Sequence, residues 1–333
     1  MKIHFDWRLA RTIDDEGNVL DEIEWDGRMT PPSVAKRLRA IQNGGVTPEA
    51  ATLIERFPEA KVDSMGAISD SDWPLADAHE EIFQSATEEL ARMGVAESSG
   101  DIDRRLDMLV SSAMEIRASW TTSEARCVEW AGLFITEADL YEQRHDIPGA
   151  ISQSSTIAEA AESLGVSPPK HEPSESEWAS MRSQASFVTE SSGMLEQQED
   201  AIRDAANSHV PSLSALLGPI SAAKLVVLAG SRERLARMPS GSLQVLGAHA
   251  AMSAHRRGAP PPKHGAVLFS MPQVSRSPRW VRGKIARFLA GKASIAVRVD
   301  HFGGEPWGKE EVDEINAEIH AIKEKFPRPP KRR

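Results

Sequence analysis

The stretch from Ile102 to Phe134, IDRRLDMLVSSAMEIRASWTTSEARCVEWAGLF, decides the fold class of this chain. Its apolar residues recur at alternating steps of four and three, which places them on one side of a helix over more than four heptads. The ten positions of this seam are Ile102, Leu106, Leu109, Ala113, Ile116, Trp120, Ser123, Cys127, Trp130 and Phe134, and nine of them are apolar. The pattern predicts a long coiled-coil helix, with one helix of an ordinary bundle as the alternative.

A second helix of the same kind is predicted from about Glu175 to Asn207. Seven of its nine seam positions are apolar, and these nine are Trp178, Met181, Ala185, Val188, Ser192, Leu195, Glu199, Ile202 and Ala206. Residues 151–165 predict one short helix, and the proline-rich residues 166–176 predict a loop. Two long helices joined in this way predict an antiparallel hairpin that can hold apart the two domains at its base or pair with a second copy. We place this self-association at Trp120, Trp130, Trp178, Val188 and Leu195.

The residues before this hairpin predict a small α/β domain. Lys2–Trp7 and Val19–Trp25 alternate like strands and flank a turn at 16–18, so they are expected to pair as a hairpin. The other expected elements are helices over 31–41 and from Thr47 to about Arg56, a strand near 61–62, and a helix over 74–93.

The charges of the chain are strongly segregated. Residues 1–208 hold 18 Lys and Arg against 40 Asp and Glu, whereas residues 209–333 hold 21 against 9. Between His209 and Val299 there are 14 basic residues and a single acid, Glu233. A folded segment this basic inside an acidic protein indicates a domain that binds a polyanion such as RNA. The alternative is a solvated basic face without a specific partner. The acidic half would repel RNA, so it is expected either to contact proteins or simply to keep the chain soluble.

Composition excludes several classes of protein. The single cysteine, Cys127, excludes a disulfide framework and a thiolate zinc site. The apolar run Leu225–Gly230 is too short to span a bilayer, and the N-terminus lacks the apolar core of a secretory signal. We therefore expect a soluble cytoplasmic protein without membrane association, bound metal or cofactor.

The basic half predicts helices and one rigid loop. Residues 212–230 predict one or two buried helices, and residues 256–265 a break. Residues 282–299 predict a basic amphipathic helix with Ile285, Phe288, Leu289, Ile295 and Ala296 facing inward. The tail from Lys323 onward is basic and rich in proline, so it is expected to be mobile.

Candidate RNA contacts gather at the break and at the start of the basic helix. Pro260-Pro261-Pro262 stiffens the backbone before Lys263 and His264, and Gly265 permits a turn behind them. In the helix, the basic side chains of Arg282, Lys284 and Arg287 are candidates for phosphate contact. Packing of His264 within the fold and solvation of Lys263 are the alternatives.

Enzymatic chemistry finds little support in the sequence. Neither phosphate-cradle motif, Gly-x-x-x-x-Gly-Lys-Ser/Thr or Gly-x-Gly-x-x-Gly, occurs. Lys263 beside His264 lacks a supporting carboxylate, and we interpret Asp300-His301 as structural. A protein-only adaptor built on the coiled coil stays open, although the positive charge of the C-terminal half disfavours it.

Residues 210–304 resemble the Nop domain in several blocks that recur in order. The blocks are Pro211–Ile220, Ala222–Leu225, Leu228–Ser231, Ala236–Pro239, Gln244–Ala248, Pro261–Gly265, Arg282–Arg287 and Ala296–Asp300. Residues 101–134 resemble, more weakly, the central helical segment of the same proteins. The resemblance is closest to the archaeal Nop-domain scaffold of box C/D small ribonucleoproteins, with the splicing protein of this family as the nearest cousin.

The resemblance implies a mainly α fold: a small α/β N-terminal domain, a long antiparallel coiled-coil hairpin and an all-helical C-terminal Nop domain. It implies a fibrillarin-binding domain over 1–97, a coiled-coil dimerisation domain over 98–208 and a Nop domain over 209–322, followed by a basic flexible tail over 323–333. The implied role is a non-catalytic scaffold. It grips a box C/D kink-turn guide RNA held by a small ribosomal-protein homologue and recruits fibrillarin for 2′-O-methylation of RNA, including rRNA. A role in another ribonucleoprotein stays open.

One block departs from the family pattern. Relatives usually carry an acidic residue and a lysine directly after the Gly-Ala of this block, where the present sequence has His249 and Ala250. A contact made by that lysine is lost here, and Arg256 and Arg257 are candidates to replace it on the RNA. We place the contact with a partner protein at Gln244, Gly247, Ala248 and His249.

Overall fold

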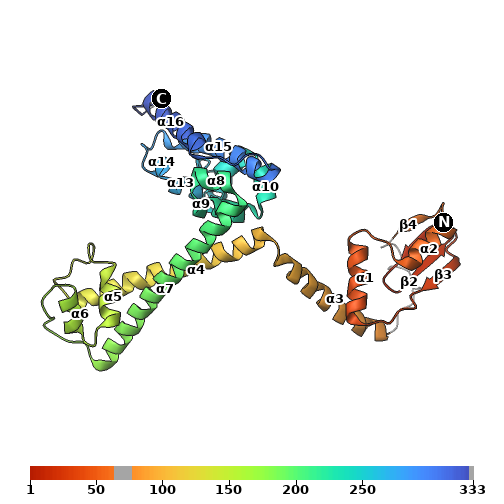
Figure 1. Cartoon of the computed structure of the whole chain (residues 1–333), viewed down its shortest axis with the longest axis horizontal. Helices are drawn as coiled ribbons and strands as arrows, with labels where there is room; N and C mark the ends of the chain where they lie inside the picture. The colour runs from red at the N-terminus through yellow and green to blue at the C-terminus, as the bar shows by residue number, and fades with distance from the viewer. Residues whose placement is uncertain (64–76, 330–333) are drawn as a thin grey trace. The chain divides into compact units, whose positions relative to one another are not determined.

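A computed structural model describes residues 1–63 and 77–329 of the chain (Figure 1). The chain divides into two compact units, Met1–Asp101 and Ile102–Arg333. The first unit contains a small sheet flanked by helices, and the described part of the second unit consists of helices and their connecting loops. The predicted fold class, mainly α with a small α/β N-terminal part, is confirmed.

The sheet of the first unit has four strands in the order β3-β2-β1-β4. These strands are β1 (Lys2–Phe5), β2 (Leu9–Ile13), β3 (Val19–Glu24) and β4 (Lys61–Asp63). The expected pairing of the first strand with 19–25 is wrong, because β2 lies between them and pairs antiparallel with both. A tight turn creates this extra strand: the Asp6 carboxylate accepts hydrogen bonds from the backbone N–H groups of Arg8 and Leu9 at 2.6 and 3.2 Å.

Three helices complete the first unit. They are α1 (Pro31–Gln42), α2 (Pro48–Arg56) and α3 (Asp77–Ser98). The buried side chains of Ile3, Phe5 and Leu53 form one small core, and a second core forms around Val34 and Ala35 of α1. The predicted start of the third helix, residues 74–76, lies outside the described residues, and the helix continues past residue 93 to Ser98.

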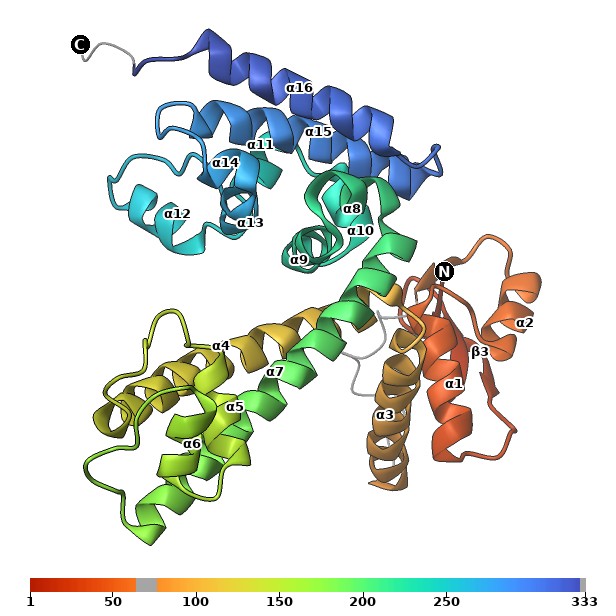
Figure 2. The same ribbon diagram turned by 60° about the vertical axis from the view of Figure 1, so that its left-hand side comes forward.

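The hairpin predicted from the heptads is confirmed. Helix α4 (Ile102–Phe134) and helix α7 (Glu175–His209) lie side by side in both views (Figures 1 and 2). Side-chain amides lock the two helices in register: Gln184 Nε2 donates to the Ser123 carbonyl at 3.3 Å, and Gln198 Nε2 donates to Ser112 Oγ at 2.8 Å.

Two short helices, not one, cap the far end of the hairpin. They are α5 (Asp146–Gln153) and α6 (Ile157–Ser163). The predicted single helix over 151–165 is wrong because Thr156 takes an extended conformation and its side chain caps the second helix through the backbone N–H of Glu159. Both helices pack on the hairpin through a core that includes Ile147, Ile151 and Ile157.

This core also buries Cys127, which gives a test of the packing. Burial, reinforced by the nearby Glu124 charge, raises the pKa of the Cys127 thiol from 9.0 to about 11. At pH 8 about 0.1% of such a thiol is ionised, so a disulfide reagent should react about a hundredfold more slowly than in urea. Because the folded pKa is raised, we expect stability unchanged below pH 9 and falling as the pH rises towards 11. Native reactivity equal to that of the unfolded chain would contradict the burial.

The C-terminal helices surround one long central helix, α15 (Arg282–Phe302). The others are α8 (Pro211–Leu217), α9 (Pro219–Ala229), α10 (Arg232–Arg237), α11 (Ser240–Gln244), α12 (His249–Arg256), α13 (Ala266–Ser270), α14 (Pro272–Ser275) and α16 (Lys309–Lys325). Helix α15 contacts α8, α10, α11, α13, α14 and α16. Four of the five residues predicted to face inward do so at least partly, but Ile295 is 50% exposed, so that prediction is wrong.

The hairpin and the C-terminal helices share one core. Leu106 and Ile202 of the hairpin are buried in the same cluster as Leu213 and Ile285. At the junction, His209 Nε2 lies 2.7 Å from Asp103 Oδ1, and the same carboxylate oxygen accepts from the Arg232 backbone N–H at 3.0 Å. The hairpin and the C-terminal helices therefore belong to one compact unit, and the division at residue 208 stays a prediction.

Helix α16 extends into the segment expected to be a tail. The helix ends at Lys325, and Phe326 packs against the core. The first three residues of the tail predicted from Lys323 are therefore helical, and residues 330–333 of that prediction lie outside the described residues.

No single helix among the described residues is long and apolar enough to cross a membrane. Helices α8 and α9 are long and apolar enough only when taken together, and they are bent by 119° at their junction.

Candidate nucleic-acid interface

The loop that carries Lys263 and His264 is fixed by the side chain of Gln244. This residue is 8% exposed, and its Nε2 donates to the Lys263 carbonyl at 2.6 Å. The Gly265 backbone N–H donates in turn to the Gln244 carbonyl at 2.7 Å. We predicted Gln244 as a partner-protein contact, but its side chain is buried and forms a hydrogen bond inside the domain. It positions the loop.

Gly265 is required by its surroundings and not by its backbone angles. Its φ of −83° suits any residue. A Cβ at this position would lie 1.9 Å from the Leu246 carbonyl oxygen and 2.8 Å from its carbon. The absence of a side chain therefore lets the loop close against the end of α11.

The loop, α13 and the start of α15 bring three predicted residues together. The His264 ring stacks on Phe269 with centroids 4.7 Å apart and an interplanar angle of 13°. The Arg282 guanidinium carbon lies 5.7 Å from the same Phe269 ring, and Arg282 Nε donates to the Ser277 carbonyl at 2.7 Å. Lys263 lies against Gly283, where an added Cβ would meet its Cδ at 3.4 Å. We call Lys263, His264, Phe269 and Arg282 the basic–aromatic cluster.

Phe269 is the member that the sequence analysis missed. It is 38% exposed although it lies in the short apolar run Ala266–Ser270. Its position five residues after His264 could have suggested this role. The sequence alone, however, does not show which apolar residue of a short helix remains exposed to solvent. An exposed ring beside two cations can stack on a base while the cations contact phosphates.

The remaining predicted RNA contacts lie elsewhere. Lys284 is exposed and its Nζ lies 4.1 Å from the centre of the Phe326 ring, while Arg287 is exposed on the outer face of α15. Arg256 and Arg257 are exposed at the end of α12. These four residues are therefore not part of the basic–aromatic cluster.

The partner-contact residues Gly247, Ala248 and His249 lead into α12. Gly247 has a φ of +81°, which favours glycine, and His249 is exposed. None of the residues of α12 is buried, so this helix presents its surface to solvent.

The few acids of this region are engaged away from the cluster. Glu233 pairs with Arg237 at 2.7 Å. Asp300 accepts from the backbone N–H groups of Ser212 and Leu213 at 2.8 and 3.0 Å, which confirms its structural role. The positive field of Lys263 and Arg282 is therefore available to an anion. Among residues 1–63 and 77–329, no group of three or more His, Cys, Asp or Glu is arranged to hold a metal ion.

The residues predicted for self-association serve the hairpin of one chain. Val188 and Leu195 are buried between the helices. Trp130 Nε1 donates to Glu177 Oε1 at 3.2 Å, Trp178 Nε1 donates to the Ser155 carbonyl at 2.7 Å, and Trp120 is partly buried. The three tryptophans are only partly buried, so self-association through them stays a prediction.

Comparison with known proteins identifies the family. Residues 125–321 match the family model "Nop", described as "snoRNA binding domain, fibrillarin". An uncharacterised NOP5 family protein of Methanocaldococcus jannaschii is 31% identical over 71% of this chain and 57% of its own length. Nucleolar protein 56 of Caenorhabditis elegans is 36% identical over 36% of this chain and 25% of its own length. The chain thus spans little more than half of the first relative and a quarter of the second.

A solved structure of a fibrillarin/Nop5p complex covers 92% of this chain and 97% of its own at 22% identity, with a TM-score of 0.39. The assignment depends on the sequence matches, because the family model covers more than half of the chain and the 31% identical relative aligns over most of it. The basic–aromatic cluster lies inside the matched region, and this chain belongs to the Nop family.

Proposed function

We propose that this chain is a non-catalytic scaffold of a box C/D ribonucleoprotein. Its C-terminal domain binds a kink-turn guide RNA that already carries a small ribosomal-protein homologue. Its N-terminal domain recruits fibrillarin, which methylates the 2′-hydroxyl of target RNA, including rRNA. The observation that carries this proposal is the basic–aromatic cluster within a Nop domain.

The cluster has the chemistry that RNA recognition needs. Lys263 and Arg282 neutralise phosphates and release counterions, and the partly exposed Phe269 offers an aromatic contact to an unpaired base. The loop is held by Gln244 before any ligand arrives, so little conformational entropy is lost on binding. Helix α12, which begins at His249, precedes this loop in the chain and has no buried residue. It offers a surface for the RNA-bound protein.

A gel shift tests the proposal directly. The chain is mixed with a box C/D kink-turn RNA, with and without the small kink-turn-binding protein. We expect a shift with the preformed complex and little or none with the RNA alone, followed by recruitment of fibrillarin. Equal binding to unrelated RNA would reduce the chain to a general RNA-binding domain, and the absence of binding at low salt would overturn the proposal.

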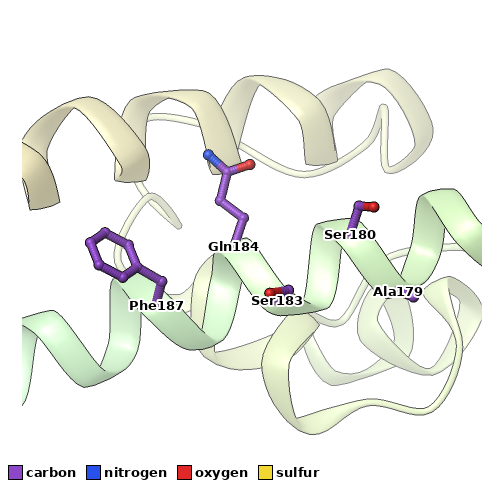
Figure 3. Close-up of a pocket in the computed structure, with 5 residues that line it drawn as sticks. All are labelled: Ala179, Ser180, Ser183, Gln184 and Phe187. Carbon is purple, nitrogen blue, oxygen red and sulfur yellow. The ribbon is translucent and has the colours of Figure 1, made fainter.

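An exposed side of α7 is a further candidate surface for self-association. A shallow depression on this side is lined by Ala179, Ser180, Ser183, Gln184 and Phe187 (Figure 3). Figure 3 shows the Gln184 side chain extending from α7 towards the neighbouring helix, while Ala179, Ser180 and Ser183 contribute small side chains. Phe187 is 44% exposed, and Met194, two turns along the same side, is 45% exposed. Small residues beside apolar ones suit close packing of another helix.

The double substitution Phe187→Glu/Met194→Glu should convert a dimer to a monomer at micromolar concentration. Each carboxylate would have to be buried without a partner, which costs several kcal/mol. Light scattering measures the mass. The variant Thr189→Glu/Asn207→Glu adds the same charge on the opposite side of α7, at a partly exposed and an exposed position, and should stay dimeric. A wild-type monomer would refute self-association, and a dimeric Phe187→Glu/Met194→Glu variant would refute this surface.

A further inference from the structure

The end of α4 and the loop that follows it expose apolar side chains at the far end of the hairpin. Tyr141 is 84% exposed and Leu133 is 73% exposed, the two highest values among the large apolar side chains that the structure describes. Leu140 between them in sequence is 38% exposed. Single exposed apolar residues are ordinary, whereas a cluster of them marks a binding surface.

Hydrogen bonds hold this loop in one conformation. Asp139 Oδ1 accepts from the backbone N–H groups of Tyr141 and Glu142 at 2.9 and 3.0 Å. Gln143 Nε2 donates to the Leu164 carbonyl at 2.9 Å, which ties the loop to α6. Leu140 lies against Gly132 of α4, where an added Cβ would be 2.7 Å from Leu140 Cδ1. The apolar side chains are therefore presented by a rigid support, which lowers the entropic cost of binding.

The surroundings of these side chains are acidic. Exposed carboxylates of the same segment belong to Glu137, Asp139, Glu142 and Asp146. Hydrogen bonds from Ser167 lower the pKa of Glu137, and the backbone N–H of Glu142 lowers that of Asp139, so both stay ionised.

The basic side chains of this segment pair with Glu124 and Glu129. Arg144 Nε and His145 Nδ1 lie 2.8 and 3.0 Å from the buried Glu124 carboxylate. Arg126 pairs with Glu129 at 2.9 Å. The segment therefore presents exposed apolar side chains together with exposed negative charge at Glu137, Asp139 and Glu142.

This charge selects the occupant. RNA phosphates are repelled by the carboxylates, and a second copy that presented the same acidic surface would be repelled as well. A basic polypeptide complements both the exposed apolar side chains and the carboxylates. We infer that Leu133, Leu140 and Tyr141 form a docking surface for a basic polypeptide segment that carries an apolar anchor residue.

Tyr141 is the single tyrosine of the chain, so it reports binding at one known position. Three short synthetic peptides are the probes: one rich in lysine and arginine with one phenylalanine, the same peptide with Phe→Ser, and a glutamate-rich version. We expect the first peptide to bind by calorimetry and to slow iodination of Tyr141. The Phe→Ser peptide should bind about tenfold more weakly, and the acidic peptide should not bind.

Matched variants of the full chain complete the test. Leu133→Ser/Tyr141→Ser should lose binding of the first peptide. Val95→Ser/Met108→Ser removes side chains that are 71% and 65% exposed elsewhere and should retain it. Thermal melting checks that both variants fold, and Tyr141→Ser alone serves if the double variant melts early.

Several results would overturn the inference. Equal affinity for the three peptides, or equal affinity of the two double variants for the first peptide, would show that no specific surface exists here. A change of oligomeric state in Leu133→Ser/Tyr141→Ser would assign the surface to a second copy. Protection of Tyr141 by a kink-turn RNA would assign it to nucleic acid. None of these results depends on whether the chain is a box C/D scaffold.

Discussion

Replacement of Gly265 by alanine is expected to lower the free energy of unfolding by about 3 kcal/mol or more. The new Cβ would lie 1.9 Å from the oxygen, 2.8 Å from the carbon and 3.0 Å from the nitrogen of Leu246. All three are backbone atoms, so no side chain can rotate away. The Gly265 N–H bond to the Gln244 carbonyl lies at the same contact and would be lost with it.

Gly291→Ala is the matched control for this substitution. Gly291 lies inside α15, and an added Cβ there meets nothing within 4 Å. Alanine at this helix position should raise the free energy of unfolding by about 0.5–1 kcal/mol. Urea unfolding followed by circular dichroism measures both variants. Equal stability of the two would show that the loop and Leu246 do not approach as described.

Charge reversal in the basic–aromatic cluster should weaken binding to the kink-turn complex by about a hundredfold or more. Lys263→Glu/Arg282→Glu removes two phosphate contacts and adds repulsion at each. The slope of log affinity against log salt should fall by roughly one for each lost contact. Titration at several salt concentrations gives affinity and slope together.

Two further variants separate binding from folding in this test. Arg282→Gln loses the charge but keeps a donor for the Ser277 carbonyl, so it should bind weakly and melt like the wild type. Lys309→Glu changes an exposed lysine of α16 outside the cluster and should bind like the wild type. Unchanged affinity of Lys263→Glu/Arg282→Glu at moderate salt would show that the cluster does not contact RNA.

Elements with a long periodic pattern could be predicted from the sequence. Helix α4 spans the predicted range from Ile102 to Phe134, and α7 starts at the predicted Glu175. A helix of this length repeats its buried face many times, so occasional polar residues in the seam do not hide it. Short elements lack this redundancy, which is why β2 was missed and why α5 and α6 were merged into one helix.

Helix α16 shows a different kind of miss. Its buried residues Ile315 and Ile319 are four apart, and the partly buried Ile322 follows at helical spacing. The pattern was present, but the proline-rich residues after Phe326 suggested a tail that begins too early. Local composition misled here because burial of this helix depends on its contacts with α15, just before it, and with α8, far back in the chain.

The sequence by itself determined the fold class, the charge segregation and the family, because periodicity, composition and ordered motifs are properties of the chain. Only the tertiary structure decided how the candidate residues are used. Gln244 turned inward to hold Lys263, the seam residues Val188 and Leu195 closed the hairpin of one chain, and Phe269 joined His264 and Arg282. The physical reason is that each of these roles depends on which side chains become buried or bonded when another segment packs against them. That packing involves residues outside the local sequence pattern.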